Sequence, residues 1–483
     1  MDHHKTPVFT ALEEAAQSGV VHFDVPGHKK RMRYGSEESF WDQMVRYDFN
    51  STRELDLLSS PSGVIREAEA LMADAYGADE AFFLVNGSTF GVLAMIMAAV
   101  EPGEKILLPR NVHKSVINGV ILSGAAPVFV DPEIDYDNGI ANGLPAWKVR
   151  QTLQDHPDIR AVLVINPTYF GAASDLEAIV RFCHEHQVAV LVDEAHGAHF
   201  PFHPDFPPSG MAVGADLSTA SVHKTGGSLT QSSILLLNEG MVSRTRVRTV
   251  LNLIQTTSPS YLLMASLDLA RRKLVLDGPG IYEELLREVR RIQGEISRIA
   301  GLSVLTRDYV DPQRGRSYFD ETKIVVNVRG LGMTGFEVYD RLKEEYSIQV
   351  ELAETYVILA LACIGDDGGT LDALVEALSD LSRRFYGEAP ALQVAQKGFF
   401  DKPTTVVSPR NAFYSPKKKV RLEDAEGEVC GESIMIYPPG IPLIIPGEKI
   451  TREVIDHYLF YEEQHCMIIN NDEDPHVLLV LGE

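Results

Sequence analysis

The stretch Ala215-Asp216-Leu217-Ser218-Thr219-Ala220-Ser221-Val222-His223-Lys224-Thr225-Gly226-Gly227 decides the fold. Its apolar and β-branched residues predict a buried strand over 217–222, and the two glycines predict a tight loop after it. Open α/β sheets bind their ligands at this carboxyl end of the strands. A lysine there is poorly solvated, which favours the neutral, nucleophilic amine. This stretch alone favours the alternative, an ordinary lysine that reaches into water.

The segments around this stretch repeat an alternation of strands and helices. Helices are expected over 64–76, 113–123 and 175–186, with a further apolar helix ending at Val100, and strands over 81–85, 105–108, 127–130, 161–165 and 188–192. Short connections between such segments indicate a mostly parallel sheet covered by helices. The predicted fold class is therefore α/β.

The chain is expected to have four parts. Residues 1–55 form an N-terminal arm with a turn at 26–30, and residues 56–270 form the large domain. A smaller α+β domain over 271–388 follows, and a C-terminal domain over 389–483 is rich in proline and glycine near its middle. Around the smaller domain we expect helices over 261–276, 335–346 and 370–385, and strands over 323–328, 349–352 and 357–363.

Composition narrows the class of partner. The formal net charge of -24 argues against nucleic acid and anionic membranes and is compatible with a cationic small molecule. Four scattered cysteines without paired spacing indicate a reducing, cytoplasmic setting. The N-terminus has no apolar run of the signal-peptide kind, and no apolar run is long enough to span a bilayer.

Two further strand ends carry polar residues. Gly87, Ser88 and Thr89 lie between a strand and a helix, where backbone N–H groups and hydroxyls can bind an anion, although a simple helix cap would look the same. Asp193 closes a buried strand, and burying a carboxylate costs several kcal/mol unless it is paired. A pyridinium N–H would be one partner, and a salt bridge or a metal are the alternatives. The histidines nearby have no recognised zinc spacing, so we expect no metal.

Asp193 precedes Lys224 by 31 positions, and the Gly-Ser-Thr turn comes about 105 positions earlier than Asp193. The three features fall on separate strand ends of one predicted sheet. Together they resemble the pyridoxal phosphate (PLP) pocket of fold-type I enzymes, in which the lysine forms a Schiff base with the cofactor. The combination is far more specific than any one part.

The chain resembles the bacterial Orn/Lys/Arg decarboxylases of fold type I, in the shorter form without an N-terminal wing domain. The matching stretches run from the arm to the C-terminal region: 26–30, 85–89, 109–115, 166–171, 192–197, 221–224, 437–442 and 446–448. The resemblance implies a PLP-dependent, aminotransferase-like fold with a large domain, a smaller domain and a C-terminal domain. The runs around Lys224 and Tyr437 are the most specific.

The resemblance also implies a role for each site residue. Lys224 holds the cofactor, Asp193 pairs with the ring nitrogen, and the ring lies between Ala195 and His113. Thr168 lies near the ring hydroxyl. The phosphate is held by Ser88, Thr89, Ser221 and His223, next to Gly87, and His196 belongs to the cofactor pocket. Lys224, His223, Asp193 and His113 are the expected catalytic residues.

The expected reaction is loss of CO₂ from a basic L-amino acid, with Lys224 or His223 returning a proton to Cα. Arginine, giving agmatine for polyamine biosynthesis, is the leading substrate, because short-form relatives are most often arginine decarboxylases; lysine and ornithine stay open. Glu351, Glu354 and Glu432 are candidates to bind the distal cation, or are ordinary surface carboxylates.

One departure bears on substrate choice, because serines stand at 59–60 where relatives tend to carry acidic and histidine residues. An aminotransferase would use the same lysine and aspartate but would usually add an arginine that clamps the α-carboxylate. A PLP-binding regulatory module should carry a basic DNA-binding domain, which this chain lacks. Since fold-type I pockets are usually completed by a second subunit, we expect at least a homodimer, with His28 and the arm as candidates to cross over.

Overall fold

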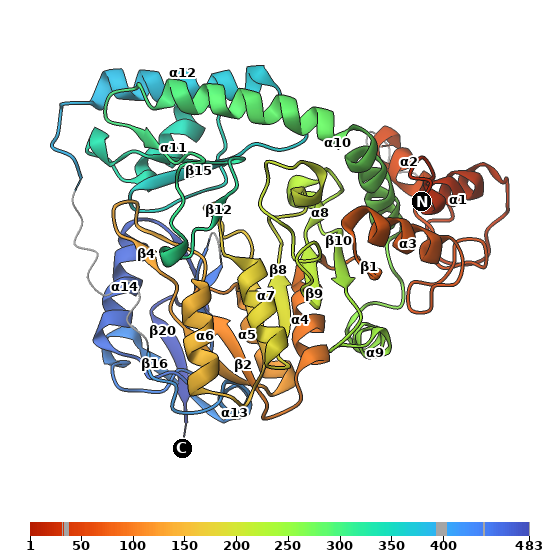
Figure 1. Ribbon diagram of the computed structural model, residues 1–483, viewed down its shortest axis with the longest axis horizontal. Coiled ribbons are helices and arrows are strands. Elements are labelled where there is room, and N and C mark those ends of the chain that lie inside the picture. The colour runs from red at the N-terminus through yellow and green to blue at the C-terminus, as the bar shows by residue number, and fades with distance from the viewer. Residues whose placement is uncertain (31, 33–37, 393–402, 438–439, 483) are drawn as a thin grey trace. The chain divides into compact units, whose positions relative to one another are not determined.

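The computed structural model describes the whole chain except residues 31, 33–37, 393–402, 438–439 and 483 (Figure 1). Pro438 and Pro439 of the C-terminal proline-glycine run therefore lie outside the described residues. The chain divides into two compact units. The first contains residues 1–98, 189–284 and 363–365, and the second contains 99–188, 285–362 and 366–483.

The first unit contains four paired strands in the order β1 (Glu80–Leu84), β10 (Ser233–Leu237), β9 (Leu217–Ala220) and β8 (Ala189–Asp193). Strands β8 and β9 are parallel, and β10 is antiparallel to both of its neighbours. Strands β1, β9 and β8 therefore run in one direction, and their carboxyl ends share one edge. The sequence prediction missed β10, although its run of Ser-Ser-Ile-Leu-Leu-Leu is fully buried.

Helices of the first unit begin and end where the sequence signals lie. Helix α3 (Val64–Tyr76) has the predicted bounds, and Gly77 ends it in the left-handed conformation. Helix α4 (Gly87–Ala99) lies very close to β9, because a Cβ placed on Gly91 would meet the Thr219 hydroxyl oxygen at 2.0 Å. Only glycine fits at this crossing. Helix α9 (Arg244–Ile254) also belongs to the first unit.

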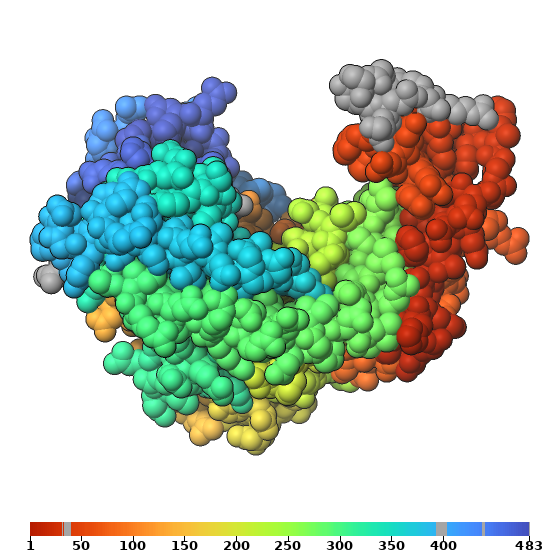
Figure 2. All heavy atoms as spheres, turned by 90° about the horizontal axis from the view of Figure 1, so that it is seen from above, coloured from red at the N-terminus to blue at the C-terminus, as the bar shows by residue number. Residues whose placement is uncertain are grey.

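The N-terminal arm contains two helices, α1 (Pro7–Gln17) and α2 (Glu38–Arg46), which the prediction of an arm with a turn at 26–30 did not include. It is anchored to helix α10 (Tyr261–Ile296) by a buried ion pair. Arg271 donates to Asp268 Oδ1 (2.9 Å) and to the carbonyl oxygens of His3 (2.8 Å) and Lys5. Asp268 Oδ2 accepts from the backbone N–H of Val8 (3.0 Å). In Figure 2 the red N-terminal residues accordingly lie against the green start of α10.

Helix α10 is 36 residues long, whereas the sequence predicted an end near residue 276. The helix contains Pro279, although proline removes one helical hydrogen bond. The helix continues through it because the next turns bury large side chains, including Tyr282, Leu285 and Leu286. Packing thus outweighs local propensity here.

The second unit contains three parallel strands in the order β6 (Ile159–Ile165), β2 (Lys105–Pro109) and β3 (Ala126–Val130). Helices α5 (Lys114–Ser123), α6 (Ala146–Asp155) and α7 (Leu176–Glu185) follow them along the chain, with Asp175 as the side-chain cap of α7. Short two-residue pairs complete this part: β4 (Ile134–Asp135) with β5 (Ile140–Ala141), and β7 (Ala172–Ala173) with β12 (Tyr318–Phe319). The predicted strands and helices are confirmed here to within about two residues.

An antiparallel sheet in the second unit has the order β11 (Ser303–Val304), β13 (Lys323–Asn327), β15 (Val357–Leu361) and β14 (Leu352–Ala353). Strand β14 is shorter and lies later than the predicted 349–352. Helices α11 (Gly335–Tyr346) and α12 (Gly368–Phe385) accompany the sheet, and α12 runs beside the end of α10 (Figure 1), where Arg291 bonds Asp372 at 2.6 Å.

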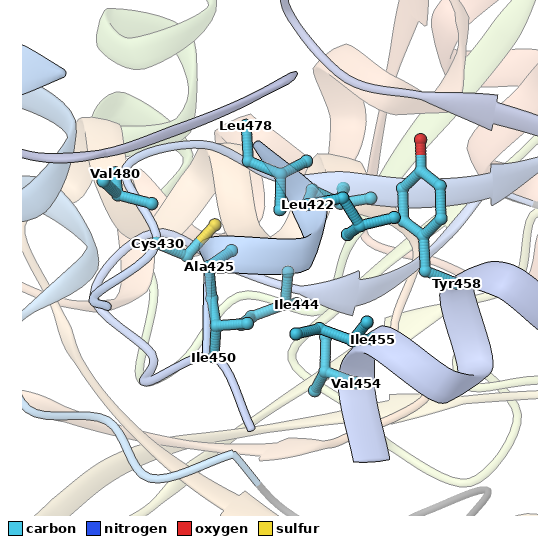
Figure 3. Packing of buried hydrophobic residues seen from close by; sticks show 11 residues of the cluster. Leu422, Ala425, Cys430, Ile444, Ile450, Val454, Ile455, Tyr458, Leu478 and Val480 are labelled. Atoms are coloured by element: carbon cyan, nitrogen blue, oxygen red, sulfur yellow. The ribbon is translucent and has the colours of Figure 1, made fainter. Parts of the chain in front are cut away.

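The C-terminal residues of the second unit have their own apolar core. Its strands pair as β16 (Lys417–Arg421) with β20 (Val477–Leu481), and as β18 (Ile441–Ile444), β17 (Ile434–Tyr437) and β19 (Met467–Ile469). Helices α13 (Pro409–Tyr414) and α14 (Arg452–Glu463) join them. Figure 3 shows Leu422, Ile444, Ile455 and Leu478 converging beside Tyr458. Nowhere in the described residues is a helix both long enough and apolar enough to cross a membrane.

Candidate active site

Lys224 lies just beyond the carboxyl end of β9, as predicted, but on a short helix rather than in a loop. Helix α8 (Val222–Thr225) begins directly after Ser221, so the strand predicted over 217–222 ends two residues early, at Ala220, and a helical turn precedes the two glycines. The backbone N–H of Gly226 bonds the carbonyl of Val222 (2.7 Å) and closes the turn. The Lys224 side chain is half-buried, and its Nζ lies 2.9 Å from Nε2 of the buried His196.

Asp193 is the last residue of β8, and it pairs with Thr219 near the carboxyl end of the parallel strand β9. It is 7% exposed, and Oδ1 accepts from the backbone N–H of Ala195 at 3.1 Å. Burial raises the pKa of its carboxyl group, against the opposing effects of that hydrogen bond and of the Lys224 charge. The carboxylate is thus held in a dry position with little compensation from the protein.

The neighbouring Glu194 has the opposite arrangement. Its Oε1 accepts from the backbone N–H of Gly210 (2.7 Å), and its Oε2 accepts from the hydroxyl of Ser218 (2.5 Å). Both oxygens therefore already have protein donors, and we regard this carboxylate as structural. Of the two adjacent acids, Asp193 is the one that has capacity for a ligand.

The predicted anion site forms at the start of α4. Gly87 has a φ of +75°, which glycine adopts without strain, and its N–H donates to the carbonyl of Gln231 (2.8 Å). Ser88 Oγ accepts from Ser221 Oγ at 2.7 Å. The turn after β1 and the turn after β9 are therefore joined through two hydroxyls at a helix N-terminus, which suits a phosphate group. Thr89 lies in the first turn of the same helix.

His223, a predicted proton donor, lies on α8. Its Nδ1 is 2.9 Å from the carbonyl oxygen of Ser232, so this nitrogen carries the proton. Burial lowers the pKa of the ring, and the Lys224 charge acts in the same direction. The imidazole that contacts the lysine amine is that of His196, 28 residues away, a pairing that the sequence did not reveal.

His113 and Thr168 belong to the second unit. His113 caps α5, and its Nδ1 accepts from Ser115 N (3.2 Å) and lies 2.8 Å from Ser115 Oγ, which fixes the ring. Thr168 follows the cis Asn166–Pro167 bond in a tight turn, where its N–H donates to the carbonyl of Ala172 (2.9 Å). Its hydroxyl oxygen is buried and has no hydrogen-bond partner in the described chain.

Two observations fit the residues of the first unit to the implied cofactor. A half-buried amine can bind an aldehyde, and the buried Asp193 has capacity for a cationic N–H donor. The Ser88 and Ser221 hydroxyls at the start of α4 are chemically suited to its phosphate.

One neighbour of the lysine was missed by the sequence analysis. The thiol of Cys363 donates to the backbone carbonyl of Lys224 at 3.4 Å, from 139 residues away in the chain. No local pattern marks this cysteine. No group of three or more histidine, cysteine or acidic side chains suited to a metal occurs among the residues described in the structure.

The candidate receptors for a substrate cation differ in their surroundings. Glu432 is buried, and its oxygens accept from the backbone N–H groups of Asn471 and Leu479 (both 2.6 Å), so it supports the C-terminal core. Glu351 is exposed on the edge of β14. Glu354 lies just after β14, and burial raises its pKa to about 8.

Comparison with known proteins identifies the family. The family model described as Orn/Lys/Arg decarboxylase, major domain, matches residues 6–370, and the one for the C-terminal domain matches 392–467. An arginine decarboxylase of Bacillus subtilis is 41% identical over 487 residues, which cover 100% of this chain and 99% of the relative. An arginine decarboxylase of Halalkalibacterium halodurans is 44% identical over 93% of this chain and 91% of its own.

Solved structures show the same fold. A lysine decarboxylase of Francisella novicida superposes with a TM-score of 0.84 at 20% identity, over 99% of this chain and 81% of its own. A structure of SPT with its PLP internal aldimine gives 0.55 at 17% identity, over 78% and 84%. The predicted α/β, fold-type I class is thereby confirmed. The chain belongs to the Orn/Lys/Arg decarboxylase family of PLP-dependent amino acid decarboxylases.

Proposed function

We propose that this protein is an arginine decarboxylase that converts L-arginine to agmatine and CO₂ in polyamine biosynthesis. The observation that carries the proposal is the contact of Lys224 Nζ with His196 beside the buried Asp193, on adjacent strand ends. The curated arginine decarboxylases at 41–44% identity over nearly the whole chain support arginine as the substrate. Lysine and ornithine are the alternatives.

The residues of the first unit would hold the cofactor. Lys224 would bind its aldehyde carbon, Asp193 would pair with its ring nitrogen, and Ser88, Thr89 and Ser221 would bind its phosphate. When bound, PLP supplies an electron sink that takes up the electron pair of a bond broken at the substrate Cα. The negative charge of Asp193 keeps the ring nitrogen protonated, which strengthens that sink.

Proton transfer falls to Lys224 and His196. The amine must lose a proton before it can act as a nucleophile, and the imidazole nitrogen at 2.9 Å can accept it. The Lys224 amine would also be the group that returns a proton to the substrate Cα. His223 Nδ1 contacts the Ser232 carbonyl, and His196 is the imidazole that contacts the lysine amine.

Exposed apolar residues of the arm support the expected homodimer. Val20, Val21, Phe23 and Val25 are all exposed, and Phe23 is 94% exposed. A run of four apolar side chains in water is typical of a surface that is covered in the assembled protein. We propose that a second copy covers it, and light scattering of wild type and of Phe23→Asp at equal concentration tests this. A monomeric wild type would contradict it.

The deciding experiment measures CO₂ release from arginine, lysine and ornithine by the protein supplied with PLP. We expect arginine to give the highest kcat/KM. A preference for lysine or ornithine would overturn the substrate but keep the reaction. Transfer of the amino group to the cofactor without CO₂ would indicate an aminotransferase and would overturn the reaction.

A further inference from the structure

A cavity of about 120 Å³ lies within the second unit, among β5, β18, α14 and the turn after β14. Its apolar wall is formed by Ile140, Phe170, Ile436, Ile441, Leu443 and Val454. A single water needs only about 10–15 Å³ of such volume, so this space can take a small organic molecule. Apolar walls with a few polar groups are typical of ligand sites.

Glu354 supplies a carboxyl group to the wall of this cavity. In the described part of the chain its carboxylate has neither a hydrogen-bond donor nor an ion-pair partner. Burial alone raises its pKa to about 8, and no nearby positive group opposes the effect. The side chain is half-buried and lines the cavity, so its carboxyl group is placed to accept a cationic donor from a ligand.

Arg110 also lines the cavity, but its charge is already compensated. Its Nη2 donates to Glu448 Oε2 at 2.9 Å, and its Nη1 and Nη2 donate to the carbonyls of Pro442 (3.1 Å) and Leu443 (3.3 Å). Arg110 and Glu448 therefore form a neutral buried pair that holds β18. It leaves Glu354 as an acid without a cation.

Two of the other polar groups of the wall, the Asn111 amide oxygen and the Glu453 carboxylate, are acceptors. The side-chain oxygen of Asn111 is buried and has no hydrogen-bond partner in the described chain. Glu453, His457 and Tyr461 follow one another at intervals of four along α14, so they share one face of the helix. A ligand that donates hydrogen bonds and carries positive charge matches this set.

We propose that this cavity binds an organic cation with a short aliphatic stem, an alkylguanidine or alkylamine, with its charged head at Glu354 and its stem against the apolar wall. Nothing in this proposal requires turnover at Lys224, so it goes beyond the proposed reaction. The ligand class is nevertheless that of the side chain of arginine and of the product agmatine. The site would therefore let the protein sense the compounds on which it is proposed to act.

Binding of a cation at Glu354 should depend on pH. In the empty cavity the raised pKa keeps Glu354 largely protonated at neutral pH, whereas a bound cation favours its charged form. Binding should therefore release a proton and strengthen as pH rises toward about 8. Glu453, His457, Tyr461, Cys466 and the Arg110–Glu448 pair are the other ionisable groups around Glu354. A protonated His457 would weaken cation binding at low pH, in the same direction.

The test is titration calorimetry of the PLP-loaded protein with n-butylguanidine, which has no carboxylate to lose. We expect Glu354→Gln to weaken binding by about ten-fold or more. Glu344→Gln is the matched control, because it removes the same charge from an exposed position of α11 and should leave binding unchanged. Glu354→Asp should retain part of the affinity if Glu354→Gln fails to fold.

Buffers with different ionisation enthalpies then report the proton release. Equal affinity of Glu354→Gln and wild type, or affinity that falls as pH rises toward about 8, would overturn the proposal. Loss of binding in Glu351→Gln with none in Glu354→Gln would also overturn it, since the exposed neighbour would then be the receptor. These outcomes do not depend on CO₂ release, so a failure here is distinguishable from a failure of the proposed function.

Discussion

Buried charges are paired to different extents in two regions of the first unit, the arm anchor at Asp268 and Arg271 and the strand-end pocket at Asp193 and Lys224. In the anchor, Asp268 and Arg271 are both fully buried, and each has several protein partners. In the pocket, Asp193 Oδ1 accepts from one backbone N–H, and Lys224 Nζ lies 2.9 Å from the imidazole Nε2 of His196. The fold completes its charge pairs where it needs stability and leaves them incomplete where a ligand can complete them.

If this contrast is correct, substitutions in the pocket should abolish chemistry and spare stability. Lys224→Ala should lower turnover by roughly 10⁴-fold or more, because one residue supplies both the cofactor bond and a proton. CO₂ release measures the effect, and thermal unfolding of the cofactor-free protein should be nearly unchanged. Retained turnover, or a retained visible absorption band of the lysine-bound cofactor, would remove the basis of the proposed function.

Substitutions in the anchor should do the reverse. Arg271→Met leaves Asp268 buried without its cation and should lower the free energy of unfolding by about 3–5 kcal/mol. Urea denaturation of the cofactor-free protein measures it. The double variant Asp268→Leu/Arg271→Met is the control and should lose less, since no uncompensated charge remains. An unchanged urea midpoint in the single variant would show that the anchor does not stabilise the arm.

Asp193→Asn should lower turnover and should also change how the free energy of unfolding depends on pH. Loss of the negative charge should lower kcat by roughly 10²- to 10³-fold, because the ring nitrogen loses its electrostatic partner. Burial raises the pKa of the Asp193 carboxyl group in the folded, cofactor-free protein. The free energy of unfolding is therefore highest below the ordinary pKa of an aspartate, where the group is protonated in both states, and it falls as pH rises through the raised pKa. Relative to Asp193→Asn, the cofactor-free wild type should therefore become less stable toward neutral pH in urea titrations, and parallel pH profiles would contradict this.

The smallest expected effect is at His196. His196→Leu should slow the capture of PLP by the cofactor-free protein by roughly 10²-fold at neutral pH, because the lysine amine loses its proton acceptor. Stopped-flow absorbance of the lysine-bound cofactor measures the rate. His203→Gln is the matched control, since this buried histidine contacts Glu283 (3.0 Å) instead. Equal rates of PLP capture in wild type and His196→Leu would show that His196 is not the proton acceptor of the lysine amine.

Local signals explain what the sequence could predict. Gly77 and Asp175 mark helix ends that the structure reproduces, because capping depends on a few neighbouring residues. The grouping of Ser88, Asp193 and Lys224 at strand ends followed from the direction of parallel strands. The roles assigned to these residues, to His113 and to Thr168 stay predictions, as does the division into an arm and three domains.

What the sequence could not predict depends on partners that are distant in the chain. Strand β10 looked like a loop continuation because its antiparallel pairing with β1 spans about 150 residues. The contacts of Lys224 with His196 and Cys363, and the cavity at Glu354, likewise bring together segments that no local pattern connects. The full length of α10 was missed as well, because the buried side chains after Pro279 keep the helix continuous.

The crossing of α4 over β9 at Gly91 makes one position a spacer for the whole pocket. Even the single methyl group of alanine would push against Thr219 and lift the helix whose first turn carries Ser88. A saturation screen for growth should therefore find residue 91 as intolerant as Lys224, although it touches no reactant. Selection at this position would therefore act through steric exclusion alone, because any side chain larger than a hydrogen atom would collide with Thr219.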